Sequence, residues 1–136
     1  MKIATVPLAT VWDMRHQIMY PAEPFDFVKV ENDTEGEHYG IYDGDQVISV
    51  ISLFFDGSRM QFRKFCTHIA YQGQGHGSQL LKYIFELAEL RKVDLVWCNA
   101  RVNASALYER FGMYKTDKVS YMAGFDFVIM EKPLPS

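Results

Sequence analysis

The sequence is short of cysteine, of basic charge and of long apolar runs. Its two cysteines, Cys66 and Cys98, are too few to form a disulfide scaffold in a chain of 136 residues. Fourteen Lys and Arg against seventeen Asp and Glu give a net charge of -3, whereas a nucleic-acid-binding protein normally has a basic excess that neutralises phosphates. The longest apolar run, residues 47–55, is far shorter than a bilayer span, and residues 1–7 lack the features of a signal peptide. We therefore expect a reduced, cytoplasmic protein that binds neither nucleic acid nor membrane.

Apolar side chains, in contrast, are abundant enough for one buried core. They make up 49% of the chain and aromatic residues make up 15%, which excludes a disordered protein. A second independent core would be unusually small at this length, so we expect a single domain over residues 1–136.

The spacing of these apolar residues predicts a mixed α/β fold. A loop with two prolines and alternating acidic residues is expected over residues 21–37. An antiparallel meander then feeds a strand–helix–strand unit over residues 60–98, which requires a right-handed parallel crossover. We therefore expect a mixed, mostly antiparallel sheet. Strands are predicted over residues 2–6, 38–42, 46–55, 60–69, 93–98, 114–122 and 125–131, and helices over residues 8–19, 78–91 and 102–111.

A glycine-rich segment, residues 72–78, lies between a predicted strand and a predicted helix. Glycines at 73, 75 and 77 allow sharp turns and close approach of a ligand, and the helix that follows offers unpaired N–H groups. The segment therefore predicts a phosphate or pyrophosphate site, with an empty helix-capping turn as the competing interpretation. A Walker A loop is excluded because no lysine is present, and a dinucleotide fingerprint fails at Ser78.

The sequence Gln-Gly-Gln-Gly-His-Gly at residues 72–77 resembles the acetyl-CoA loop of the Gcn5-related N-acetyltransferase (GNAT) superfamily. Residues 104–113 are similar to the family's tyrosine-containing helix, with Met113 where phenylalanine is usual, and residues 127–132 resemble its last strand. Two departures concern the contacts to the pantetheine arm. Arg101 stands where asparagine is common, with Asn103 nearby, and residues 67–69 replace the usual Val-x-Pro.

The resemblance implies a GNAT-like fold and an N-acetyltransferase that moves an acetyl group from acetyl-CoA to a primary amine, without a metal. An amine of a small molecule or peptide would attack directly in a ternary complex, with Tyr108 as the general acid that protonates the leaving sulfur. A homodimer is left open. The residues implied to bind acetyl-CoA are Phe65, Cys66 and Thr67 along the arm, Gln72, Gly73, Gln74, Gly75, His76, Gly77 and Ser78 at the pyrophosphate, and Asn103.

Several alternatives stay open at this point. No general base is assigned, although His68, His38 and Glu37 are candidates. Cys66 and His68, two residues apart on one predicted strand, would also suit a covalent route through the thiol. The chain could instead be a catalytically silent acyl-CoA-binding module, or an interaction domain with an empty glycine loop.

The acceptor side is implied by the family to comprise residues 12–37 and about 122–127. Its acidic character predicts a cationic amine as acceptor, with a merely solvated acidic loop as the competing interpretation. The acidic residues concerned are Glu23, Asp26, Glu31, Asp33, Glu35, Glu37 and Asp126.

Overall fold

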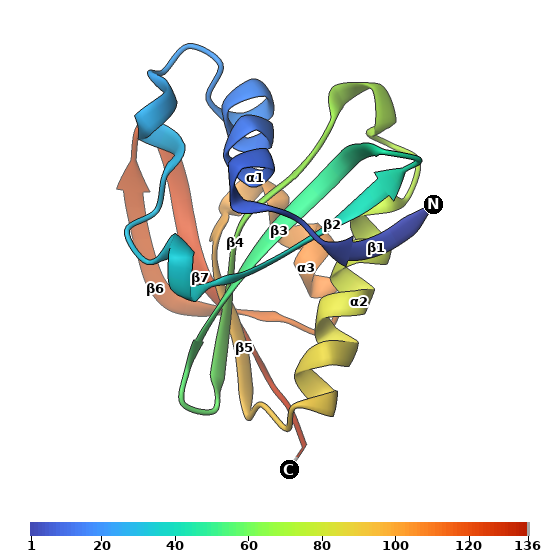
Figure 1. The fold of residues 1–136 in the computed structure, drawn as a ribbon. Coiled ribbons are helices and arrows are strands. Elements are labelled where there is room, and N and C mark those ends of the chain that lie inside the picture. The colour runs from blue at the N-terminus through green and yellow to red at the C-terminus, as the bar shows by residue number, and fades with distance from the viewer. Residues whose placement is uncertain (136) are drawn as a thin grey trace.

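A computed structural model describes residues 1–135, which form one seven-stranded sheet with helices on both faces (Figure 1). The strand order is β1-β2-β3-β4-β5-β7-β6, and the pairing is antiparallel except between β4 and β5. The predicted fold class, a mixed and mostly antiparallel sheet with one parallel crossover, is confirmed. The strands are β1 (Lys2–Thr5), β2 (Glu37–Asp43), β3 (Gln46–Asp56), β4 (Arg59–Thr67), β5 (Leu95–Arg101), β6 (Tyr114–Met122) and β7 (Phe125–Pro133).

The helices follow the predicted apolar spacing. α1 (Leu8–Met14) continues in a wider π-helical turn, Arg15–Met19, and stops before Pro21. α2 (His76–Leu90) makes the crossover from β4 to β5, and α3 (Ser105–Glu109) is shorter than expected because residues 102–104 form a 3₁₀ turn. No helix among residues 1–135 is long and apolar enough to cross a membrane.

Two apolar clusters hold the layers together, one on each face of the sheet. The larger cluster packs α2 and α3 against the sheet, and Leu80, Leu81 and Ile84 of α2 are fully buried in it. The smaller cluster packs α1, through Val11 and Met14, against the opposite face. Burial of such side chains contributes about 1.5–3 kcal/mol each, so both faces of the central strands are fixed by packing.

Residues 20–36, which join the first helix to β2, are fastened to the sheet by a buried ion pair. The Arg15 guanidinium donates to both carboxylate oxygens of Asp33, at 2.7 and 3.0 Å, and also to Ser52 Oγ of β3 at 2.8 Å. Arg15 is 0% and Asp33 2% exposed. Trp12 Nε1 and the Val30 amide donate to the same carboxylate. The acid-rich loop expected from the sequence is therefore a fixed part of the fold.

Candidate active site

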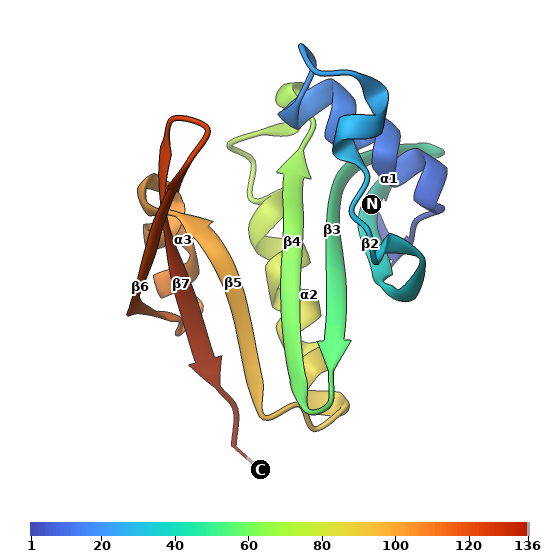
Figure 2. The ribbon, with the colours of Figure 1, turned by 90° about the vertical axis from the view of Figure 1, so that its left-hand side faces the viewer.

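β4 and β5 are paired at one end and separate at the other (Figure 2). The parallel register runs from Arg59 opposite Leu95 to Gln61 opposite Trp97 and stops there. Beyond this point the edge of β4 that faces β5 is unpaired from residue 62 to Thr67. An unpaired strand edge offers N–H and C=O groups to an extended ligand in the manner of an additional strand. Three of the residues predicted to contact the pantetheine arm, Phe65, Cys66 and Thr67, lie on this free edge.

The glycine loop follows directly on this edge and leads into α2. Gly73 and Gly75 have φ of +76° and +85°, a left-handed conformation that favours glycine, and Gly75 is the N-cap of α2. Gln72 Nε2 donates to the Thr67 carbonyl at 2.9 Å, and Gln74 Nε2 donates to the Ala70 carbonyl at 3.3 Å. Both glutamine side chains, predicted as cofactor ligands, therefore use an amide nitrogen to hold the loop in shape.

Three observations fit a pyrophosphate on this loop. A Cβ built on Gly73 or Gly75 meets nothing within 4 Å, so the loop presents its backbone to open space. A Cβ on Gly77 would lie 2.9 Å from Cζ of Phe65, so any larger residue there would displace the Phe65 ring. His76 Nδ1 is buried and has no hydrogen-bond partner within the described residues. An orphaned buried nitrogen beside an open helix N-terminus suits an anionic ligand.

Tyr108 lies on α3 next to the point where β4 and β5 separate. Its ring packs against Phe62, with 5.4 Å between the ring centroids, and Phe62 is the first residue of β4 beyond the last β4–β5 pair. Burial, with a smaller contribution from the neighbouring Cys98, raises the pKa of Tyr108 above its usual value. The phenol therefore stays protonated at neutral pH, as a proton donor must, and its role as the general acid stays a prediction.

Asn103 and Ser78 lie at the two borders of the site. Asn103 is exposed on the 3₁₀ turn after β5, and Ser78 is half-buried in the first turn of α2. The neighbouring Arg101 turns its guanidinium over the Phe125 ring, 3.9 Å from the centroid. Arg101 is therefore engaged with an aromatic side chain of β7, and the contact predicted between Asn103 and the cofactor stays a prediction.

The prediction that Cys66 and His68 share a strand face is wrong. β4 ends at Thr67, and His68 caps the 3₁₀ turn Ile69–Tyr71 by accepting the Ala70 amide on Nδ1 at 3.2 Å. Cys66 is buried in the α1 cluster, and burial raises the pKa of its thiol to about 12. A thiol that is neutral and buried is a poor nucleophile, so the covalent route loses its structural basis.

We expect Cys66→Ala to keep most of the turnover of the wild-type enzyme, since direct attack by an amine needs no thiol. The measurement is release of free CoA thiol from acetyl-CoA in the presence of an accepted amine. Cys98→Ala, at the other buried cysteine, is the matched control for the loss of a sulfur from the core. Complete inactivity of Cys66→Ala alone, in a protein that still folds and binds acetyl-CoA, would restore the covalent route.

The remaining base candidates are engaged in contacts of their own. His38 is buried, with Nδ1 2.7 Å from Ser52 Oγ and Nε2 2.8 Å from the Asp33 carbonyl. Glu37 accepts from the Arg91 guanidinium and, at 2.7 Å, from the Tyr39 hydroxyl, and Arg91 holds the pKa of Glu37 below its usual value. Neither group is placed to take a proton from an acceptor amine.

Two of the seven acidic residues expected on the acceptor side, Asp33 and Glu37, do not contribute a free carboxylate to that surface. Asp33 is inside the protein rather than on its surface: burial acts to raise its pKa, but hydrogen bonds from Arg15, Trp12 and the Val30 amide outweigh burial and lower it. Glu37 is paired with Arg91, next to the end of α2. Within the loop expected over residues 21–37, Asp33–Glu35 forms a 3₁₀ turn.

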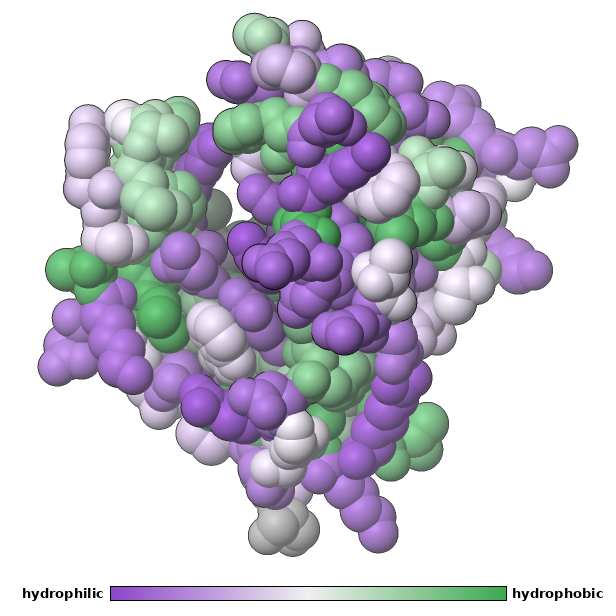
Figure 3. Space-filling view, turned by 60° about the vertical axis from the view of Figure 1, so that its left-hand side comes forward, coloured by the Kyte–Doolittle hydropathy of each residue, from purple (hydrophilic) through white to green (hydrophobic). Residues whose placement is uncertain are grey.

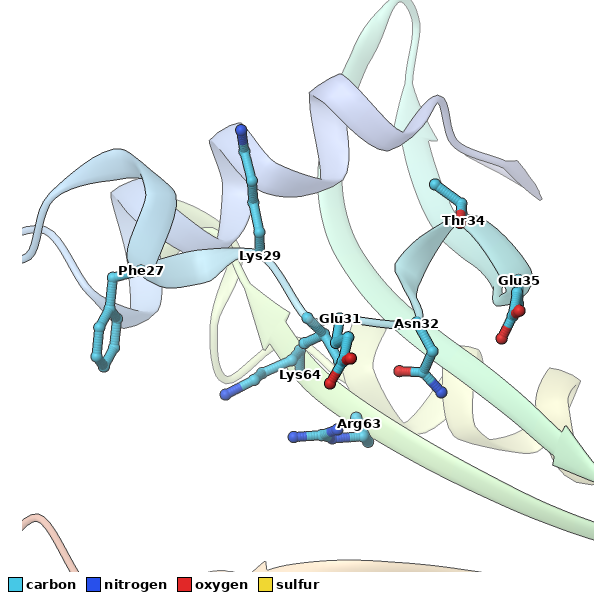
Figure 4. Close-up of a pocket in the computed structure, with 9 residues that line it drawn as sticks. Phe27, Lys29, Glu31, Asn32, Thr34, Glu35, Arg63 and Lys64 are labelled. Atoms are coloured by element: carbon cyan, nitrogen blue, oxygen red, sulfur yellow. The ribbon is translucent and has the colours of Figure 1, made fainter.

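An open cavity of about 780 Å³ lies beside the bulged part of β4, on the face opposite α2. Hydrophilic residues gather along the middle of this side of the molecule, next to a hollow between its two lobes (Figure 3). The side chains of Arg63 and Lys64 enter the cavity from β4 (Figure 4). The residues that line it are Phe27, Lys29, Val30, Glu31, Asn32, Thr34, Glu35, Arg63 and Lys64.

Sequence reasoning missed Arg63 and Lys64. The available signal was the pair of consecutive basic residues inside this strand, since regular alternation would place one of them in the core. No three His, Cys, Asp or Glu side chains among residues 1–135 come together as a group that could hold a metal ion.

Comparison with known proteins agrees with this geometry. The family model for the acetyltransferase (GNAT) domain matches residues 15–134. An uncharacterized N-acetyltransferase of Bacillus subtilis, YitI, is 26% identical over 98% of this chain and 97% of its own. The crystal structure of an N-acetyltransferase candidate from Lactobacillus plantarum has a TM-score of 0.88 at 27% identity, covering 98% of both chains. A GNAT family acetyltransferase from Elizabethkingia anophelis with acetyl-CoA bound has a TM-score of 0.75 at 18% identity, covering 98% of this chain and 97% of its own, which shows a shared fold.

Proposed function

Because the chain belongs to the GNAT family of acetyltransferases, as the resemblance of its glycine loop and tyrosine helix implied, we propose that it transfers an acetyl group from acetyl-CoA to a primary amine. The observation that carries the proposal is the separation of β4 from β5 just past Gln61. The opening lies between the glycine loop, which suits a pyrophosphate, and Tyr108, which suits proton donation.

Backbone groups of the chain would supply the main contacts to the cofactor. The free edge of β4 at Phe65, Cys66 and Thr67 would pair with the pantetheine arm, and the amides at the start of α2 would bind the pyrophosphate. Neither contact depends on a particular side chain. Holding the two reactants together supplies much of the rate, since it replaces a collision in solution with a reaction inside one complex.

When bound, acetyl-CoA supplies a thioester whose carbonyl carbon is open to attack. The lone pair of a neutral acceptor amine forms the new C–N bond there as the C–S bond breaks. The Tyr108 hydroxyl gives its proton to the departing sulfur, and the proton lost from the amine nitrogen is relayed through solvent to the tyrosinate, which restores the phenol. We propose direct transfer without a covalent enzyme intermediate, which agrees with the burial and the high pKa of Cys66.

Acetyl-CoA is expected to raise the melting temperature of the protein. At a hundred times its dissociation constant, a ligand adds about 2.7 kcal/mol to the free energy of unfolding, which amounts to roughly several degrees at this size. Gly75→Val should abolish the rise, because Gly75 has φ of +85° and a branched side chain there would cover the loop amides.

The matched control is Gly57→Val in the β3–β4 turn. Gly57 also has a positive φ, +59°, with open space around it, so the substitution strains the backbone away from the loop. It should lower the melting temperature of the free protein and keep the rise on binding. An undiminished rise in Gly75→Val would place the cofactor elsewhere, and binding without thiol release for any amine would indicate a silent acyl-CoA-binding protein.

For the compartment we propose the reducing cytoplasm, on the basis of two free buried thiols.

A further inference from the structure

A β-bulge in β4 places two positive charges in the same cavity. Met60 and Phe62 point into the α2 core, and Phe65 also packs there, three residues later instead of two. The β3–β4 register shifts at this place, and Lys64 has φ of +53°. Because one extra residue is inserted, Arg63 and Lys64 both lie on the cavity face rather than on opposite faces (Figure 4).

Neither of these cations forms an ion pair with a carboxylate within residues 1–135. The ion pairs within residues 1–135 are Arg15–Asp33, Lys29–Asp26 and Arg91–Glu37. Lys64 Nζ instead donates to the Tyr20 hydroxyl at 2.7 Å and lies over the Tyr20 ring, 4.8 Å from its centroid. This contact fixes the ammonium at the cavity without cancelling its charge, and both side chains are half-buried. Partly desolvated, unpaired cations are a preformed site for an anion.

The cavity also carries negative charge, from Glu31 and Glu35. Figure 4 shows the Glu31 carboxylate on the same side as Arg63 and Lys64, whereas Lys29 turns away from them toward α1. Lys29 forms an ion pair with Asp26, and its Nζ lies over the Trp12 ring, 4.8 Å from the centroid. A purely cationic polyamine would be repelled by Arg63 and Lys64. A purely anionic ligand would be repelled by the two glutamates. A molecule with both signs of charge close together matches the cavity.

The cavity lies beside the part of β4 that is no longer paired with β5. Arg63 follows Phe62, which packs against Tyr108 on the other face of the sheet at the point where β4 and β5 part. We propose that the acceptor is amino-acid-like, an amine with its own nearby carboxylate, and that Arg63 and Lys64 bind this carboxylate. The proposal rests on the acetyl transfer proposed above and specifies its acceptor class. Glu31 and Glu35 would then favour the amino group at the same site.

The test compares free amino acids with their carboxamides as acceptors. For the wild-type enzyme, kcat/KM measured by CoA thiol release should be at least about 10-fold higher for an accepted amino acid than for its amide, since charge-assisted hydrogen bonds are the stronger ones. Arg63→Gln should lower the value for the amino acid by about 10- to 100-fold and leave that for the amide nearly unchanged. Lys64→Gln should act in the same direction.

Arg59→Gln is the matched control, since Arg59 lies on the same strand, outside the cavity, with its guanidinium 6.0 Å from the centre of the Trp97 ring. It should leave the preference for the carboxylate intact. Equal or better turnover of amides or of peptide-amide amines by the wild-type enzyme would overturn the proposal. So would an Arg63→Gln variant that folds, binds acetyl-CoA and loses activity equally toward both acceptors.

Binding of the same amino acids to the CoA-loaded protein, measured by calorimetry, separates the two proposals. Binding that depends on Arg63, without acetylation of any amine, would support the carboxylate site and overturn the proposed transfer. Acetylation of amines with no dependence on Arg63 or Lys64 would overturn the carboxylate site and support the transfer. Melting temperatures of the variants show that each one is folded.

Discussion

Asp33→Ala is expected to lower the free energy of unfolding by about 3–5 kcal/mol and the melting temperature by roughly 10–20 °C. The substitution leaves the Arg15 guanidinium fully buried without its carboxylate. It also removes the acceptor for Trp12 Nε1 and for the Val30 amide, and so loosens the segment before β2. The measurement is thermal or urea unfolding at neutral pH.

Glu31→Ala is the control, because Glu31 is an exposed acid in the same segment and should change stability by about 0.5 kcal/mol or less. A double variant, Arg15→Met with Asp33→Leu, should recover part of the loss because no buried charge then lacks a partner. A loss below about 1 kcal/mol in Asp33→Ala would contradict the account of this ion pair. Because the pKa of Asp33 is lowered on folding, its contribution is present above the ordinary value of 3.8 and is lost as the pH falls through the folded value.

Tyr108→Phe is expected to lower kcat by about 100-fold while leaving acetyl-CoA affinity near that of the wild type. The substitution removes one hydroxyl and keeps the ring that packs against Phe62. Because the pKa of Tyr108 is raised, ionisation of this residue should not limit the rate anywhere below about pH 10.

Tyr83→Phe provides the matched comparison, since Tyr83 is another half-buried phenol packed on the same core. Its kcat should equal that of the wild type, with acetyl-CoA binding measured in parallel by the melting-temperature shift. Full activity in Tyr108→Phe would remove Tyr108 from the proton transfer and leave it as a packing residue.

The glycine loop and the tyrosine helix could be predicted because their information is local. Glycines at fixed spacing before an amphipathic helix predict a phosphate-binding loop without any knowledge of the rest of the fold. The structure places Gly73 and Gly75 in the left-handed conformation, as expected. The end of β4 could not be predicted as well, because His68 continues an alternation that looks like a strand. What ends the strand is a 3₁₀ turn held by a hydrogen bond from Ala70 to the His68 side chain.

The acceptor side was predicted less well because its contacts link residues far apart in the sequence. Asp33 looks like a surface acid until Arg15, 18 residues earlier, is brought against it by the first helix. Likewise, the extra residue at Lys64 changes which side chains share a face, and a one-residue insertion leaves little trace in the apolar pattern.

The separation of β4 from β5 also bears on how the protein avoids aggregation. Unpaired strand edges are templates on which other chains can add, and they are usually blocked by charge or by short length. Here the free edge of β4 is recessed between two halves of one sheet that remain joined from Arg59 to Gln61. A single extended arm can enter from the open end, but the edge of another folded sheet would collide with β5. The geometry that admits a thin linear ligand therefore also keeps this edge from pairing with a second molecule.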